Sequence, residues 1–239
     1  ACRLPAAPPA STILLQMNEQ YLIIGAGKLL QILIAMAGMR LMTHMLSAAE
    51  VGSFYLILSL SAYFSLVFLS PVGLYINRRL HKWRQDGNLL NYFGCYNVYV
   101  ALVCLAAAAL LFPARLFLGI GSGINPAALC FLAACYIYCG TWNSTIIPAL
   151  NMLNYRRSFV AFTTGTLLLS LAFSLMLVKL YAPSAVLWLF GQVAALFAAA
   201  AAALMYLLRK IKDKPDAGHI WACLKAPELG GVLKFSLPL

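Results

Sequence analysis

Six apolar stretches, each long enough to cross a bilayer, dominate this sequence. A helix needs roughly 20 mostly apolar residues to span the hydrocarbon core, and it satisfies its backbone hydrogen bonds internally. Hydrophobic residues make up 63% of the chain and charged residues 10%, so a soluble fold could not bury the apolar surface. We therefore expect an all-α membrane protein, a six-transmembrane-helix bundle. The expected spans are Tyr21–Met45, Phe54–Ile76, Tyr92–Phe112, Ala127–Leu150, Phe159–Tyr181 and Ala185–Leu208.

The basic residues are unevenly distributed between the connections. The chain has 17 Lys and Arg against six Asp and Glu. Cytoplasmic loops of membrane proteins collect Lys and Arg, so this excess indicates topology rather than a nucleic-acid partner. Connections on one side carry only Arg115 and Lys179, which predicts that both ends of the six-span unit are cytoplasmic. The other side carries Arg78, Arg79, Lys82, Arg84, Arg156, Arg157, Arg209, Lys210, Lys212, Lys214 and Lys225.

The segments outside the spans lie at the two ends of the sequence. Residues 1–20 are rich in Pro and Ala and lack a cleavable signal pattern, so we expect a flexible N-terminal arm or an upstream extension. Residues 21–208 are expected to form the six-helix transmembrane lobe, and 209–230 a basic cytoplasmic loop. The ending VLKFSLPL is typical of a helix start, so 231–239 are expected to begin a truncated seventh helix.

Signatures of enzymes and metal sites are missing from the sequence. It contains no G-x-S-x-G, H-E-x-x-H or P-loop pattern, and no two cysteines are spaced C-x-x-C. The middle of each expected span lacks Asp and Glu, which argues against a proton or sodium relay built on an intramembrane carboxylate. We therefore expect no catalytic residue, no metal and no cofactor, and an amide and hydroxyl lining suits transport better than catalysis.

Two basic residues lie inside the first expected span. An Arg at mid-bilayer costs roughly 2.5–3.5 kcal/mol on insertion scales, so something must offset the charges of Lys28 and Arg40. One interpretation is that both side chains snorkel to the interface. The other is a cationic lining for an anionic ligand, in which Lys28, Arg40 and His44 are candidate substrate-binding residues. Arg40 and His44 are four residues apart and share a helix face.

Polar residues follow one face of the second and of the fourth expected span. Four of them in the second span fall within about 40° of one another on an ideal helix, and Tyr136 and Asn143 share a face of the fourth. Such faces can contact a hydroxyl-rich ligand, or they can hydrogen-bond to neighbouring helices. Under the first interpretation these six residues also bind substrate. Pro71 and Gly73 are expected to kink or loosen the cytoplasmic end of the second span. The four residues of the second span are Ser59, Tyr63, Ser70 and Asn77.

Three segments carry a family pattern. The first is MLSAAEVGSFYLILSLSAYFSLVFLSPVGLYINRRLHKWRQDGNL, with His44, a short turn containing Glu50 and Gly52, a Ser-rich span and a Gly-x-x-x-x-Arg exit at Gly73–Arg78. The others are PALNMLNYRRSFV and LKFSLPL. Over about residues 20–239 the chain resembles bacterial polysaccharide flippases, the O-antigen or Wzx-like transporters of the multidrug/oligosaccharidyl-lipid/polysaccharide exporter superfamily.

The resemblance implies a two-lobe transporter with a central cavity, of which this chain would be the N-terminal lobe. It implies export by flipping of an undecaprenyl-pyrophosphate-linked oligosaccharide across a bacterial inner membrane, for cell-surface polysaccharide or lipopolysaccharide biosynthesis. Cavity cations would hold the pyrophosphate or acidic sugars. The expected partners are membrane lipids, the lipid-linked oligosaccharide and the missing C-terminal lobe.

Three alternatives stay open at this point. The chain could belong to a drug or metabolite exporter of the same superfamily. It could be a membrane-embedded lipid-sugar transferase, which needs a catalytic acid near a membrane face, where Glu50 and Asp86 are the candidates near the first spans. It could also be a non-catalytic scaffold that works as a homo-oligomer.

Overall fold

The computed structural model describes residues 10–118 and 124–210, with side chains over 22–117 and 124–210. Helices α2 and α3 and the π-helical turn η1 between them form one continuous rod. The described part of the chain therefore holds six helical rods long and apolar enough to cross a membrane, and it contains no strand. The all-α, six-span bundle expected from the sequence is confirmed. The elements are α1 (Ala10–Met45), α2 (Ala48–Phe64), η1 (Ser65–Leu69), α3 (Ser70–Gln85), α4 (Leu89–Leu118), α5 (Pro126–Met152), α6 (Arg156–Leu180) and α7 (Ala185–Lys210).

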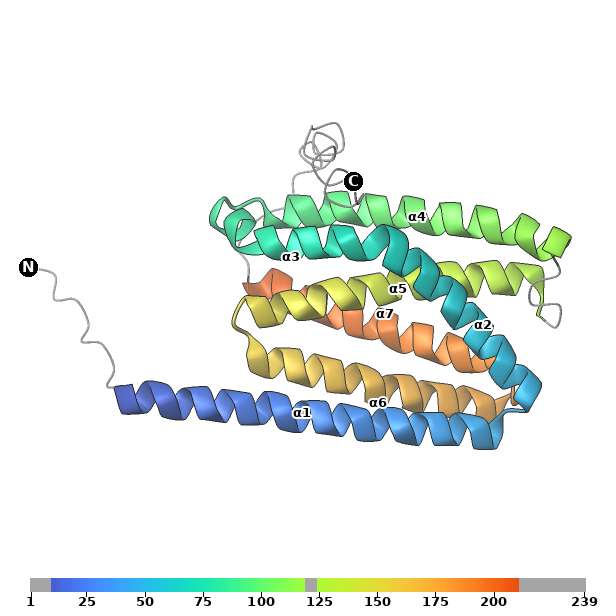
Figure 1. Cartoon of the computed structure of the whole chain (residues 1–239), viewed down its shortest axis with the longest axis horizontal. Helices are drawn as coiled ribbons and strands as arrows, with labels where there is room; N and C mark the ends of the chain where they lie inside the picture. The colour runs from blue at the N-terminus through green and yellow to red at the C-terminus, as the bar shows by residue number, and fades with distance from the viewer. Residues whose placement is uncertain (1–9, 119–123, 211–239) are drawn as a thin grey trace, which may run out of the picture.

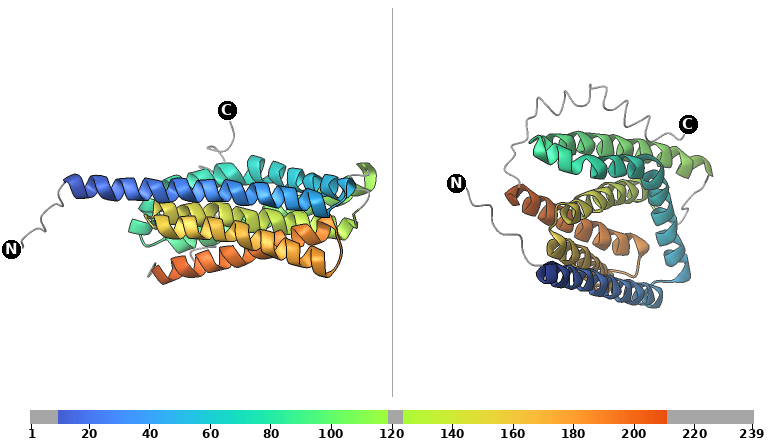
Figure 2. Two further views of the ribbon diagram at one scale, coloured as in Figure 1. Left: turned by 90° about the horizontal axis from the view of Figure 1, so that it is seen from below. Right: turned by 60° about the vertical axis from the view of Figure 1, so that its left-hand side comes forward.

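The six rods run side by side, and the turns between them gather at two opposite ends of the bundle (Figure 1). Helix α5 is central and contacts α2, α3, α4, α6 and α7, whereas α1 packs mainly on α6. The α3–α4 and α5–α6 turns lie at one end, together with the C-terminal end of α7. The α1–α2 and α6–α7 turns lie at the other end (Figure 2).

The described basic residues are concentrated at one end of the bundle, which we call the basic end. It contains the last turns of α3 and α7 and the first turn of α6. Arg115 and Lys179 lie near the opposite end, where α4 and α6 finish. The alternation of charge along the sequence thus matches the alternation of helix ends in the fold. The residues at the basic end are Arg78, Arg79, Lys82, Arg84, Arg156, Arg157, Arg209 and Lys210.

The N-terminal helix is longer than the sequence predicts. A flexible arm is expected over 1–20, yet α1 begins at Ala10, directly after Pro9. No proline follows until well past this helix, and Ala, Leu, Gln and Met are good helix formers, so the helix extends this far. Residues 1–9 lie outside the described part of the chain. So do 211–239, and with them most of the predicted basic loop and the predicted start of a seventh helix.

The predicted second connection is also largely helical. Helix α3 continues to Gln85, beyond the expected span end at Ile76. An apolar stripe explains the extension, because Val72, Ile76, Leu80 and Trp83 recur every three or four residues and are all buried. The basic residues of α3 therefore occupy its exposed side rather than a loop.

The second rod bends at η1 (Figure 1). The backbone N–H of Ser70 donates to the carbonyl of Ser65, five residues back, which is the π-helical pattern. Pro71 follows at once; it has no N–H, and its ring crowds the carbonyl four residues earlier. The Tyr99 hydroxyl of α4 donates to the Phe68 carbonyl at 2.9 Å, within η1. The kink predicted for this span is thus present, but it lies in the turn before Pro71.

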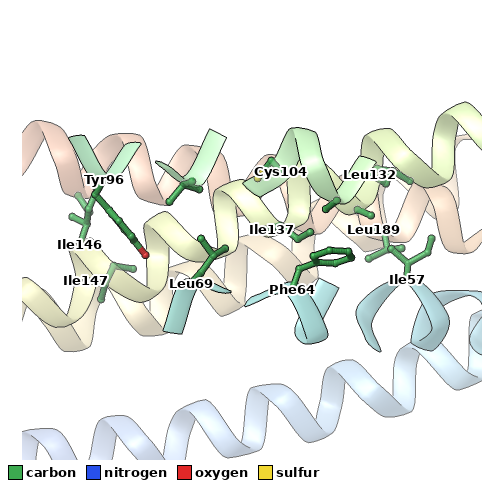
Figure 3. Close-up of a cluster of buried hydrophobic side chains, with 14 of the residues drawn as sticks. Ile57, Phe64, Leu69, Tyr96, Cys104, Leu132, Ile137, Ile146, Ile147 and Leu189 are labelled. Atoms are coloured by element: carbon green, nitrogen blue, oxygen red, sulfur yellow. The ribbon is translucent and has the colours of Figure 1, made fainter. Parts of the chain in front are cut away.

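The core lies between α5 and the helices around it. Figure 3 shows buried side chains from α2, η1, α4, α5 and α7, among them Ile57, Leu69 and Ile137. Helices α6 and α7 come close at Gly191, where an added Cβ would lie 2.5 Å from the backbone nitrogen of Ser174. Tight packing of small residues is one of the forces that hold membrane helices together.

One carboxylate links the N-terminal ends of α2 and α7. Ser47 caps α2 by accepting a hydrogen bond from the Glu50 backbone N–H at 3.3 Å. The Glu50 side chain in turn accepts a hydrogen bond from the backbone N–H of Ala185, the first residue of α7. A carboxylate is favourable at a helix N-terminus because it meets unsatisfied N–H groups and the positive end of the helix dipole. Glu50 therefore fastens the α1–α2 turn to the α6–α7 turn.

Candidate functional site

Two adjoining hollows follow one side of α5. The larger, of about 600 Å³, lies between α5, Tyr96 of α4 and the rod α2–η1–α3. The smaller, of about 250 Å³, lies between α1, α2, α5, α6 and α7. Both are lined by Leu58 and Tyr136, so they meet at these two residues. We call the two hollows together the α5 cleft.

The larger hollow has a polar lining. Gly140 leaves room in it, because an added Cβ there would meet nothing within 4 Å. Gly73, opposite, has only the Tyr96 hydroxyl at 3.6 Å from the corresponding position. The hollow is therefore wide where polar side chains from four elements, η1, α3, α4 and α5, converge. Those side chains are Ser65, Ser70, Asn77, Tyr96, Tyr136, Thr141, Ser144 and Thr145.

The hydroxyl groups of α5 are held in place by their own helix. Thr141 donates to the carbonyl of Ile137 at 2.6 Å, and Ser144 and Thr145 donate to the carbonyl of Thr141 at 2.9 and 2.8 Å. Each hydroxyl hydrogen is thereby used, while the oxygen keeps lone pairs. Thr141 and Thr145 are buried and Ser144 is exposed, so Ser144 is the hydroxyl that presents an acceptor to a ligand with hydroxyl donors.

Asn77 carries an unmet hydrogen-bonding group at the same hollow. Its Oδ1 atom is buried, and no donor reaches it within the described residues. Leaving a buried acceptor unsatisfied costs about 1–3 kcal/mol. Asn77 lines the larger hollow, and a turn of its side chain would bring this oxygen to a ligand or water donor there, which makes Asn77 the strongest binding candidate in the cleft.

The structure brings together three of the six polar residues predicted to bind substrate. Ser70, Asn77 and Tyr136 line the larger hollow. Ser59 and Tyr63 are exposed on α2 and line neither hollow. The cause is η1, since a π-helical turn adds a residue relative to an α-helix and rotates the faces before and after it against each other. The single polar stripe expected along the second span is therefore wrong.

Asn143 lies on another side of α5 and has a structural role. Its Nδ2 donates to the carbonyl of Cys139 at 2.9 Å and, across the helix interface, to the carbonyl of Leu196 in α7 at 2.6 Å. This is the helix-to-helix hydrogen bonding that was the alternative interpretation of the polar faces.

The three predicted basic residues lie on α1, outside the lining of the cleft. Lys28 donates to Gln31 Oε1 at 3.3 Å, and its Nζ lies 5.9 Å from the centre of the Phe159 ring of α6. Arg40 and His44 are exposed near the C-terminal end of α1. Arg40 can thus reach the membrane interface, as the snorkelling interpretation requires.

Sequence reasoning left Tyr96 out of the candidates, although it lines the larger hollow and contacts Thr145 of α5. The two hydroxyl oxygens are 3.4 Å apart. No periodic signal identifies Tyr96, because α4 carries several tyrosines and the sequence does not say which of its faces meets α5. Thr141, Ser144 and Thr145 are visible in the sequence as added polarity in the fourth span, but not as one wall.

The described acidic side chains offer no catalytic pair. Glu50 caps α7, and Asp86 is exposed at the C-terminal end of α3, at the opposite end of the bundle. Among the residues that the structure describes, no three His, Cys, Asp or Glu lie close enough to hold a metal ion.

Comparison of the chain with protein-family models, with curated proteins and with solved structures finds no match. The geometry of the α5 cleft is therefore the main guide to function.

Proposed function

We propose that this bundle is one lobe of a transporter that moves a lipid-linked oligosaccharide across a bacterial inner membrane. The observation that carries the proposal is the larger hollow of the α5 cleft, which is lined both by Asn77, whose buried amide oxygen has no donor among the described residues, and by hydroxyl-bearing residues of α5. Sugar hydroxyls are donors as well as acceptors, so they complement both features.

The two hollows differ in polarity in the way an amphiphilic ligand requires. The smaller hollow is lined mostly by apolar side chains, including Met39, Met42 and Phe54. The larger hollow extends toward the basic end, since Asn77 lies on α3. A ligand with an isoprenoid chain and a sugar headgroup would place its polar part in the larger hollow and apolar atoms in the smaller one.

Transport would require the cleft to open alternately to the two membrane faces. In the proposed mechanism this lobe rocks against a second, C-terminal lobe that closes the cleft, with the ligand between them. The bend at η1 supports such a movement, because a π-helical turn interrupts the regular hydrogen bonding of the rod that forms one cleft wall.

The acidic residues whose side chains the structure describes argue against the transferase alternative. A lipid-sugar transferase needs an acid or a metal ligand beside its substrate. Glu50 is engaged with the N-terminus of α7, and neither Glu50 nor Asp86 lines the cleft. The drug-exporter alternative is separated from our proposal by the choice of ligand in the following test.

Direct binding tests the proposal without requiring a complete transporter. The purified chain in lipid nanodiscs is mixed with undecaprenyl-pyrophosphate-linked oligosaccharide, and bound ligand is counted by native mass spectrometry. We expect Asn77→Leu to weaken binding about tenfold, the effect of one hydrogen bond to a buried group. Ser59→Ala, on the same rod but outside the cleft, is the matched control and should bind as the wild type does.

Two results would reject the flippase proposal. One is equal binding by wild type and Asn77→Leu. The other is preference for a hydrophobic drug cation over the lipid-linked sugar, which would favour the exporter alternative.

The proposed orientation places the basic end in the cytoplasm. After replacement of the native cysteines, Gln85→Cys should be protected from an impermeant thiol reagent added outside, and Ala182→Cys should react. Both positions are exposed, one at each end of the bundle. The opposite labelling pattern would reverse the orientation.

A further inference from the structure

Four basic residues lie on α6 and on the two helices beside it, α1 and α7, toward the basic end of the bundle (Figure 1). Lys28 comes from α1, Lys210 ends α7, and the first turn of α6 carries Arg156 and Arg157. We call these four residues, together with the aromatic residues Tyr155, Phe159 and Tyr206 next to them, the α6 basic patch. None of its residues lines the α5 cleft.

Aromatic rings hold both lysines of the patch. The Lys210 Nζ lies 5.9 Å from the centre of the Tyr206 ring, and the Lys28 Nζ lies 5.9 Å from that of Phe159. Tyr206 is itself fixed, because its ring meets Tyr155 edge-on at 6.0 Å and its hydroxyl accepts a hydrogen bond from Ser158 at 2.9 Å. The two lysines thus come from the helices on the two sides of α6, and each has an aromatic ring beside its ammonium group.

The position of Lys28 relative to α6 is also fixed, because α1 and α6 are in close contact beside it. At the preceding residue, Gly27, an added Cβ would lie 2.5 Å from the Val160 side chain, so the two helices touch here. Gln31 connects Lys28 to α6, since it accepts from Lys28 and donates to Thr164 Oγ1 at 3.4 Å. A lysine that only avoided the bilayer centre would not require this close contact between helices.

Neither lysine has a carboxylate partner among the described residues. The described acidic side chains are Glu50, at the other end of the bundle, and Asp86, at the end of α3. The tendency of cytoplasmic loops to be basic explains a positive membrane face, but it does not explain a lysine within the apolar span Leu22–Met45. Phosphate groups of anionic lipids lie at the membrane interface, where tyrosines are enriched, and Tyr155 and Tyr206 lie beside Lys210 in the patch.

We propose that the α6 basic patch binds the headgroup phosphate of an anionic phospholipid from the surrounding bilayer. The phosphate rests over the first turn of α6, between Lys28 and Lys210, and the acyl chains follow the apolar surfaces of α1 and α6. The lipid connects α1 to α6 and α7, and this matters because α1 is one of the two least buried rods of the bundle. The proposal does not depend on the proposed transport function.

Thermal unfolding in nanodiscs of defined composition tests the site. The chain is compared in phosphatidylcholine alone and in phosphatidylcholine with added phosphatidylglycerol. We expect the anionic lipid to raise the unfolding temperature of the wild type by about 3 °C, with one or two anionic lipids retained in native mass spectra. Lys28→Gln with Lys210→Gln should lose most of this rise, and Lys28→Arg with Lys210→Arg should keep it.

A matched control separates a site from a general surface charge. Lys82→Gln with Arg84→Gln removes the same charge from the same end of the bundle, but from α3. This pair should keep the rise. An equal loss in both Gln pairs would overturn the proposal in favour of a diffuse surface potential. An equal rise with soluble glycerol phosphate in phosphatidylcholine discs would overturn it in favour of a free-anion site.

If the double Gln variant does not fold in phosphatidylcholine, Lys210→Gln alone replaces it. Lys210 is exposed in the last turn of α7, and its substitution leaves the α1–α6 contact intact. The readout is then the number of phosphatidylglycerol molecules retained in native mass spectra. Retention equal to that of the wild type would reject the site.

Discussion

Two sides of α5 carry similar polar side chains and use them differently. Toward α7 and α4, the polar groups connect helices: Asn143 donates to the Leu196 carbonyl, and Tyr138 and Trp142 both donate to Asn97 Oδ1, at 2.6 and 3.1 Å. Toward the α5 cleft, each of the three hydroxyls bonds to a carbonyl of its own helix, and Thr145 also contacts the Tyr96 hydroxyl of α4 at 3.4 Å. A polar residue in a membrane span is thus a binding candidate only when neighbouring helices have not already used its hydrogen-bonding groups.

The close contact between α6 and α7 at Gly191 should be the part of the bundle whose stability is most sensitive to substitution. Gly191→Ala would place a methyl group 2.5 Å from the Ser174 nitrogen and 2.8 Å from the Phe173 carbonyl carbon, both backbone atoms that cannot rotate away. We expect the free energy of unfolding in detergent to fall by about 3 kcal/mol, the upper range for overpacking. The control is Gly165→Ala, in α6, where a Cβ meets nothing within 4 Å. It should be neutral or stabilising by about 0.5–1 kcal/mol, and equal losses in both variants would show that the close contact is not what matters.

The two asparagines test the comparison directly. Asn143→Leu removes a hydrogen bond between helices and should lower the free energy of unfolding by about 1 kcal/mol, without weakening binding of the lipid-linked oligosaccharide. Both residues carry a buried amide oxygen that no described donor reaches, so the variants differ in the hydrogen bond from Asn143 to Leu196. Asn77→Leu removes only an unmet acceptor, so stability should hold or rise while binding falls. Denaturant unfolding and native mass spectrometry on the same two samples measure both quantities. If Asn143→Leu weakened binding and Asn77→Leu lowered stability, Asn143 would be the binding residue and Asn77 the helix connector, contrary to our assignment.

A smaller effect is expected at the junction of α4 and α5. Tyr138→Phe removes one of two donors to Asn97 Oδ1, and the Trp142 indole still serves that oxygen. The expected loss is about 0.5 kcal/mol in the free energy of unfolding, near the average for hydrogen bonds between membrane helices. Tyr55→Phe, at an exposed tyrosine on α2, is the control and should change nothing. A loss above about 2 kcal/mol would mean that the two donors act as one cooperative unit.

The smallest effect should come from Arg40. The side chain is exposed and lines neither hollow, and it has no hydrogen bond or ion pair with another side chain within the described residues. Arg40→Ala should change the free energy of unfolding by less than about 0.5 kcal/mol and leave oligosaccharide binding unchanged. Arg40→Lys should behave in the same way. A clear loss of binding in Arg40→Ala, partly restored in Arg40→Lys, would instead support the cationic lining predicted from the sequence.

The six rods could be predicted because span length and apolar composition are local properties of the sequence. The ends of the rods were harder to predict. The basic residues after Ile76 indicate a loop, but the stripe of Val72, Leu80 and Trp83 keeps the chain helical, and only packing against the bundle decides between the two.

The cleft was predictable only in part, since it depends on the relative rotation of helices. A helical wheel that assumes the same rotation at every residue places Ser59 and Ser70 on one face. The π-helical turn η1 lies between them and changes this rotation. Proline at 71 predicts a disturbance but not a π-helical turn. Asn77 and Asn143 are equivalent in sequence terms, and each has a buried amide oxygen without a donor among the described residues. The hydrogen bond to Leu196 makes Asn143 a helix connector, and its place in the lining of the larger hollow makes Asn77 a binding candidate.

The cap that Glu50 provides also sets an order of assembly. Its partner, the Ala185 N–H, lies 135 residues later in the chain. A ribosome adds about 5–20 residues per second, so the carboxylate is made roughly 7–27 s before the group that it caps. Helix α2 has its own cap from Ser47 and can enter the membrane meanwhile. The last of the described rods to be synthesised therefore completes this end of the bundle, and a nascent chain that stalls before α7 presents an acid that the finished bundle keeps engaged.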